Sequence, residues 1–121
     1  MARSVIPNAL DRRHLIEKNL SQAQALQIAE AYLAEGRSVE AIDFLAKAEA
    51  REQLTELRAA AVESGDVFLL RLAARALDEP PTRAEWSAVG DAAAAAGRDR
   101  YAADARRQSD HGDDDQGSIT P

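Results

Sequence analysis

The sequence predicts an all-α protein, a short right-handed solenoid of about three antiparallel helical hairpins. Gly36, Gly65 and Gly97 each separate two alanine-rich amphipathic stretches, and they lie roughly 30 residues apart, a period typical of solenoids built from helix pairs. Large apolar side chains are scarce, and alanine supplies much of the 45% hydrophobic content, which favours helices that approach closely. We therefore expect one helical-repeat domain over residues 21–107.

The composition narrows the class of protein. A chain of 121 residues without cysteine offers neither disulfides nor thiolate metal ligands. No apolar run reaches the roughly 18 residues of a membrane span, and the N-terminus lacks the apolar core of a signal peptide. We therefore expect a soluble, cytoplasmic protein that does not bind membranes. The net charge of −6 disfavours general attraction to nucleic acid or anionic lipid.

Residues 1–20 are expected to hold a helix that caps the first hairpin. Asn8 is a suitable N-cap, and the helix would run through His14, Leu15 and Ile16 to about Asn19. Terminal units of solenoids commonly need such a cap, because their outer face is otherwise uncovered.

The first hairpin begins with a capping box. The hydroxyl of Ser21 can accept from the backbone three residues on, while the side chain of Gln24 reaches back. Apolar residues then recur at helical spacing until Gly36, which can adopt the left-handed conformation that ends a helix. Ser38 is the expected cap of the next helix, whose apolar stripe runs from Val39 to about residue 49.

The second hairpin is organised in the same way. Gly65 ends its first helix, and Asp66 is well placed to cap the second. The expected apolar stripe of that second helix consists of Phe68, Leu69, Leu72 and Ala76. Pro80 and Pro81 then end the helical pattern, because proline cannot continue a helix and holds the preceding residue extended.

The third hairpin starts with a second capping box, formed by Thr82 and Glu85. Trp86 is expected to pack between helices rather than to face a partner. Gly97 ends the first helix, and a final helix is expected over residues 99–107. Residues 108–121 are rich in Asp, Gly, Ser and Gln, so we expect a disordered acidic tail there.

Small and large residues recur in the first hairpin at a recognisable spacing: Ala25, Ile28, Ala29, Tyr32, Gly36, Ala41, Leu45 and Ala48. This pattern resembles the tetratricopeptide repeat. The third hairpin is similar through Trp86, Val89, Gly90, Gly97 and Ala102. The middle hairpin departs from the family, since Arg58 and Leu70 stand where small side chains are usual and Ala74 replaces a large one.

The resemblance implies a protein–protein interaction or scaffold module that binds a peptide or protein in a groove lined by the first helix of each hairpin. The groove residues it implies are Leu26, Glu30, Leu33, Glu52, Thr55, Val62, Glu63, Ser87 and Asp91. Because this surface is acidic with apolar spots, we expect a basic or amphipathic partner. Each of these carboxylates, taken alone, is better explained as part of a solvated helix face.

Patterns for catalysis are weak, so we expect a protein that is not an enzyme and that uses no cofactor or metal. Glu49, Glu52 and Glu56 are expected to share a helical face, where paired carboxylates could do acid–base chemistry. Because Arg51 and Arg58 lie close to these carboxylates in the sequence, exposed ion pairs are the better explanation. No catalytic, cofactor-binding or metal-ligating residue is assigned.

Nucleic-acid binding is the alternative from a different class. Positive charge gathers over residues 98–107, at Arg98, Arg100, Arg106 and Arg107. The acidic tail follows at once, and the carboxylates of the first hairpin would repel phosphates, so this alternative ranks second. Self-association through this arginine-rich end, or through the N-terminal helix, also stays open.

Overall fold

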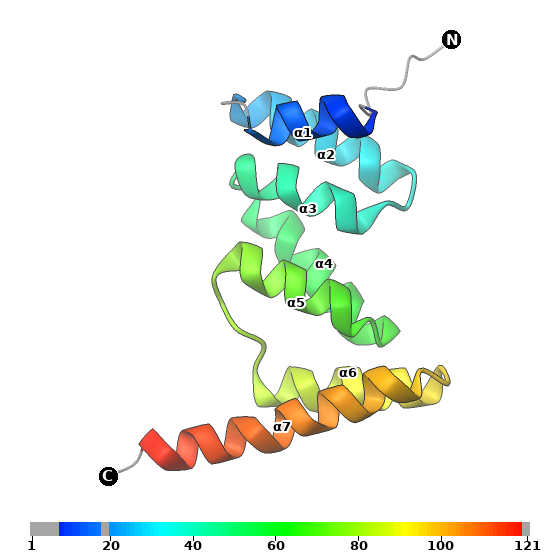
Figure 1. Cartoon of the computed structure of the whole chain (residues 1–121), viewed down its shortest axis with the longest axis vertical. Coiled ribbons are helices and arrows are strands. Elements are labelled where there is room, and N and C mark those ends of the chain that lie inside the picture. The colour runs from blue at the N-terminus through cyan, green and yellow to red at the C-terminus, as the bar shows by residue number, and fades with distance from the viewer. Residues whose placement is uncertain (1–7, 18–19, 120–121) are drawn as a thin grey trace. The chain divides into compact units, whose positions relative to one another are not determined.

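A computed structural model of the chain is all-helical over the residues that it describes, which are 8–17 and 20–119 (Figure 1). The expected all-α class is therefore confirmed. Side chains are described for these residues except Leu15, Glu17 and positions 111–119. The helices are α1 (Ala9–Glu17), α2 (Gln22–Ala34), α3 (Ser38–Lys47), α4 (Arg51–Ser64), α5 (Val67–Leu77), α6 (Arg83–Ala95) and α7 (Asp99–Ile119).

The chain divides into two compact units, residues 1–55 and residues 56–121. The first unit holds α1, α2, α3 and the start of α4, and the second holds the rest of α4 with α5, α6 and α7. The boundary lies inside a continuous helix, so no proline, glycine or change in composition marks it in the sequence.

The first unit is built on the hairpin of α2 and α3. Ala25 and Ala29 on α2 and Ala41 on α3 are fully buried, and such small side chains let two helices approach closely. The rings of Tyr32 and Phe44 stack beside them with centroids 5.8 Å apart, and both residues are fully buried. Thin alanine contacts and one aromatic pair therefore form the core of this hairpin.

Local capping chemistry fixes where the helices begin. Side-chain oxygens at four predicted N-caps accept from the first helical turn: Asn8, Ser21, Asp66 and Thr82. Both predicted capping boxes are also complete, because Gln24 and Glu85 reach back to the N-cap backbone. An N-cap of this kind stabilises a helix by about 1 kcal/mol. The end of the N-terminal helix near Asn19 lies outside the described residues.

The prediction that Ser38 caps α3 is wrong. The N-cap is Arg37, which makes no capping hydrogen bond with its side chain, and Ser38 is already helical. The reason lies in the turn at Gly36, where φ is +72° and the Arg37 N–H donates to the Tyr32 carbonyl at 2.9 Å. This tight closure leaves only one residue between the turn and the helix.

Glu49 does not share a helix with Glu52 and Glu56, so the expected carboxylate face is wrong. Its φ is +53°, and it stands between the end of α3 and the start of α4. Its carboxylate instead accepts a hydrogen bond from the side-chain amide of Gln22 at 3.0 Å. The left-handed residue turns the chain before the second helix pair begins.

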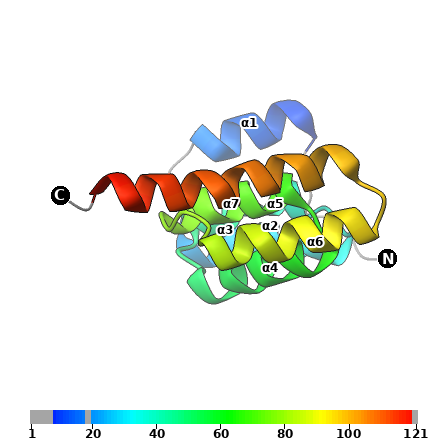
Figure 2. The ribbon, with the colours of Figure 1, turned by 90° about the horizontal axis from the view of Figure 1, so that it is seen from below.

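In the second unit α4 and α6 lie on one side and α5 and α7 on the other (Figure 2). Gly65, in the turn between α4 and α5, is buried and has φ of +73°. A Cβ atom built on it would lie 2.5 Å from the backbone nitrogen of Ala93 in α6. Only glycine allows both the left-handed turn and this close approach to a neighbouring helix.

Of the four residues predicted for the apolar stripe of α5, only Leu69 is buried, while Leu72 and Ala76 are half-buried. Val67, Leu70 and Ala74 are buried, whereas Phe68 is 51% exposed. Since one step along a helix rotates the side chain by about 100°, Phe68 stands beside the packed face rather than within it. Val39, in the first turn of α3, is also exposed instead of being part of its stripe.

The last helix continues past residue 107, where the sequence predicts its end and the start of a disordered acidic tail. α7 spans Asp99–Ile119, and both Gln108 and Ser109 are half-buried. No proline interrupts residues 99–119, so the backbone can remain helical beyond the apolar segment. Thr120 and Pro121 lie outside the described residues.

Candidate interaction surface

The predicted contact residues on α2 share one face of the helix. Leu26 and Leu33 are half-buried and Glu30 is exposed between them, at a spacing that places all three on one side. Ala25 and Ala29, on the adjoining side of the helix, are fully buried. The predicted contact residues of α2 thus border its packed face and remain at least partly accessible.

The predicted residues of α4 fall into both units. Glu52 and Thr55, in the first unit, are exposed, while in the second unit Val62 is half-buried and Glu63 is exposed. The hydroxyl of Thr55 donates to the Arg51 carbonyl at 2.8 Å, so its proton is used within the helix. The carboxylates and the valine are thus the groups that α4 offers to a partner.

On α6, Ser87 and Asp91 are both exposed. They line a small cavity of about 60 Å³, together with Arg106 and Ser109 of α7. The predicted pair therefore stands on the exposed border between two helices. The contribution of α7 to this border was not predicted, because the sequence analysis assigns binding only to the first helix of each hairpin.

Arg58 was expected in exposed ion pairs, and this is wrong, since the residue is only 8% exposed. Its Nε and Nη2 donate to the two carboxylate oxygens of Glu85, each at 2.6 Å. Nη1 donates to the Glu79 carbonyl at 2.7 Å and Nη2 to the Pro80 carbonyl at 3.1 Å. The guanidinium thus joins α4 to the segment that leads into α6.

Glu85 serves two structural purposes at once. It completes the capping box with Thr82 and is the bidentate partner of Arg58. The hydrogen bond from Arg58 lowers the pKa of the Glu85 carboxyl, partly offset by burial, and the Thr82 backbone N–H adds to the lowering. The same pairing raises the pKa of Arg58. Both perturbed groups hold helices together.

Acid is expected to destabilise the second unit through Glu85. The pKa of the Glu85 carboxyl is lower in the folded chain than in the unfolded chain. Its stabilising contribution is therefore complete above the unfolded pKa of about 4.3, and it is lost as the pH falls through the folded pKa. Urea unfolding followed by the single tryptophan, Trp86, at several pH values measures this loss. The Glu85→Gln variant should show a shallower slope below about pH 5; an unchanged slope would mean that other carboxylates cause the acid sensitivity.

Trp86 is 8% exposed, so the expectation that it packs between helices is confirmed. The guanidinium of Arg71 lies 5.2 Å from the centroid of its ring and also pairs with Asp104. One edge of the tryptophan reaches a cleft of about 330 Å³ whose lining includes Arg71, Arg75 and the two prolines, Pro80 and Pro81. Sequence patterns did not indicate this cleft, because α5 and the following loop meet Trp86 of α6 only in the folded unit.

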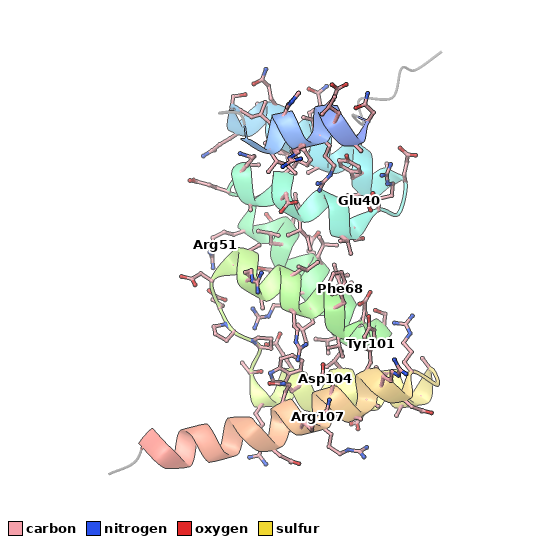
Figure 3. All side chains as sticks on the ribbon, in the orientation of Figure 1. Glu40, Arg51, Phe68, Tyr101, Asp104 and Arg107 are labelled. Carbon is pink, nitrogen blue, oxygen red and sulfur yellow. The ribbon has the colours of Figure 1, made fainter. Side chains whose placement is uncertain are left out.

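The arginines of the nucleic-acid alternative are partly engaged within the protein. Arg98 donates to the Gly65 carbonyl at 3.5 Å, and Arg107 pairs with Asp104 at 3.7 Å. Figure 3 shows Asp104 and Arg107 on α7. A cleft of about 330 Å³ is lined by Arg98, Asp99, Arg100 and Tyr101. Acidic side chains therefore stand among these cations, which weakens the attraction of the group for phosphates.

No protein family, curated protein or solved structure matches this chain. The likeness to tetratricopeptide repeats accordingly depends on the residues of the first and third hairpins alone. The structure defines the fold class of the chain, which is all-α. Among its described residues, none of the helices combines the length and the apolar character needed to cross a membrane.

Proposed function

We propose that this chain is a non-catalytic interaction or scaffold module of the cytoplasm, a tetratricopeptide-like solenoid that binds a basic or amphipathic segment of another protein. One observation carries the proposal. All nine predicted contact residues are exposed or half-buried, while neighbouring positions on the same helices, such as Ala29, Ala61 and Val89, are fully buried. This separation of accessible from packed positions supports the register taken from the resemblance.

The charges of this surface support a cationic partner. Glu30, Glu52, Glu63 and Asp91 form no ion pair or hydrogen bond through their carboxylates with any described side chain or backbone group. Their negative charge is thus available to a lysine or arginine of a partner. Half-buried leucines and a valine beside them supply apolar contact, which suits a helix with one basic and one apolar face.

The pattern of pKa shifts supports a binding role rather than catalysis. Catalytic groups commonly combine a perturbed pKa with a place in a cleft. The shifts resolved among the described residues belong to two ion pairs, Arg37 with Glu40 and Arg58 with Glu85, in which hydrogen bonding is the largest cause. The first pair lies within the start of α3, and the second joins α4 to α6, so the perturbed groups have structural roles.

A matched pair of charge reversals on α2 tests the proposal. The probe is a fluorescein-labelled amphipathic helix of leucine and lysine, titrated with the full chain and followed by anisotropy. Glu30→Lys should weaken binding about ten-fold, because it places like charges together at the contact. Glu35→Lys, which makes the same change at the end of the same helix, should alter the affinity less than about two-fold.

Two outcomes would contradict the proposal. Equal losses in both variants would show attraction to net charge rather than to a defined surface. Failure of the wild-type chain to bind the peptide, combined with salt-dependent binding of duplex DNA, would favour the nucleic-acid alternative. Light scattering of the free chain separates either result from self-association.

A further inference from the structure

One arginine of α1 fills a site on the hairpin of α2 and α3. Its guanidinium carbon lies 5.7 Å from the centroid of the Tyr32 ring and 5.5 Å from that of Phe44. Nη2 of this residue, Arg12, donates to the Glu40 carbonyl at 2.8 Å and to the Asp43 carboxylate at 3.1 Å. We call the four receiving residues, Tyr32, Phe44, Glu40 and Asp43, the arginine box.

The box has the chemistry of a guanidinium receptor. Stacked aromatic rings attract a planar cation through their faces, while a carbonyl and a carboxylate accept its N–H groups. A second arginine, Arg37, lies 4.9 Å from the Tyr32 ring centroid and pairs with the Glu40 carboxylate. Two cations thus gather at one aromatic pair, and Figure 3 labels Glu40 on α3.

The fit of Arg12 in the box is incomplete. Its Nε is buried without a hydrogen-bond partner among the described residues, and so is the hydroxyl of Tyr32, a residue that is fully buried. A buried polar group that lacks a partner destabilises the arrangement that contains it. With Arg12 in the box, the Nε of this arginine and the hydroxyl of Tyr32 thus lack hydrogen-bond partners. An occupant that supplied these hydrogen bonds would bind the box more favourably.

The other described side chains of α1 are exposed or half-buried. Leu10 is 63% exposed, Arg13 and His14 are exposed, and Ile16 is half-buried. None of the side chains described on α1 is fully buried. Figure 1 shows α1 as a short helix at the N-terminal end of the described chain. Arg12 therefore provides a described attachment of α1 to the hairpin of α2 and α3.

We propose that the arginine box recognises an arginine on a helix of the protein partner, and that α1 is an internal competitor which such a helix displaces. The inference rests on the proposed function, because it names the side chain by which a basic partner is recognised. In the free chain Arg12 occupies the box. On binding, the arginine of the partner takes its place and α1 detaches from the hairpin.

The first test measures competition with the full chain. The probes are two amphipathic peptides that differ only in one central residue, arginine or lysine. Arg12→Ala should raise the affinity for the arginine peptide about ten-fold. This gain is expected if Arg12 leaves the box free in only about a tenth of the wild-type molecules, because the apparent affinity falls by that fraction. The control Arg13→Ala removes the same charge one residue away and should change the affinity less than about two-fold.

The second test follows α1 itself. Hydrogen exchange of the amides of Ala9–Glu17 should accelerate when the arginine peptide is added to the wild-type chain, and the lysine peptide should have a much smaller effect, because lysine lacks the planar fork. Adding Asp43→Asn to Arg12→Ala should abolish most of the gain in affinity. Circular dichroism of each variant verifies that the helices remain.

The outcomes separate this inference from the proposed function. If the peptides bind in a Glu30-dependent way but Arg12→Ala gives no gain and α1 exchange is unchanged, the competitor role is wrong and the interaction module stands. If neither peptide binds the wild-type chain or Arg12→Ala, the proposed function fails as well. Equal displacement by the lysine peptide would also overturn arginine recognition.

Discussion

Replacing Gly65 by alanine is expected to lower the free energy of unfolding by about 3 kcal/mol. Two costs add. The backbone φ of +73° is unfavourable for any residue with a Cβ. The new Cβ would also stand 2.5 Å and 2.6 Å from the nitrogen and Cα of Ala93, and 2.8 Å from the carbonyl carbon of Ala92. These are backbone atoms of α6, so the clash can be relieved only by moving a helix.

Gly97→Ala provides the matched control in the same unit. Its φ of +76° carries the same strain, but a Cβ there would meet nothing within 4 Å. The expected loss is about 1 kcal/mol. Urea unfolding followed by circular dichroism and by Trp86 fluorescence compares the two variants. Equal losses would show that the close approach to α6 contributes nothing and that only the turn conformation matters.

Arg58→Ala is the second large effect, with an expected loss of about 3 kcal/mol. The substitution leaves the Glu85 carboxylate without its bidentate partner and removes the donor that the Glu79 and Pro80 carbonyls share. The Glu85 side chain is 24% exposed, so water recovers part of the lost interaction. Arg58→Lys should give an intermediate loss, because lysine keeps the charge but cannot bind both oxygens.

Arg107→Ala is the control for Arg58→Ala, because it removes an arginine whose side chain is 72% exposed. Its pair with Asp104 is solvated, so the change should stay within about 0.5 kcal/mol. Thermal unfolding of the three variants and the wild-type chain at neutral pH gives the comparison. A loss of less than about 1 kcal/mol for Arg58→Ala would mean that the buried pair adds no net stability.

In the tetratricopeptide-like register that we propose, Arg58 stands at a position where the family has a small residue. Its guanidinium donates to carbonyls and a carboxylate that lie 21–27 residues further along the chain. The segment with Pro80 supplies two of these acceptors. A small side chain at this position would leave them without a donor.

Local signals in the sequence were sufficient for much of the fold. The N-caps at Ser21, Asp66 and Thr82 depend on partners three residues away, and the glycine turns depend on the conformational freedom of one residue. Interactions of this range can be recognised from spacing alone.

Contacts between distant residues could not be predicted in this way. Arg12 pairs with Asp43 across 31 positions and Arg58 with Glu85 across 27, and nothing in the spacing of either pair distinguishes it from a pair of solvated charges. The exposure of Phe68 depends on how α5 is rotated against its neighbours. The site at α1 and the cleft beside Trp86 were missed for the same reason.

Photocrosslinking from α2 tests the interaction function most directly. Benzoyl-phenylalanine is placed at position 30 or position 35 of the full chain in its native cells, and the adducts are treated with protease or nuclease after illumination. We predict a nuclease-resistant, protease-sensitive adduct that forms from position 30 and is weak or absent from position 35. Equal labelling from both positions, or nuclease-sensitive adducts that require Arg98 to Arg107, would contradict a protein-binding surface on this helix.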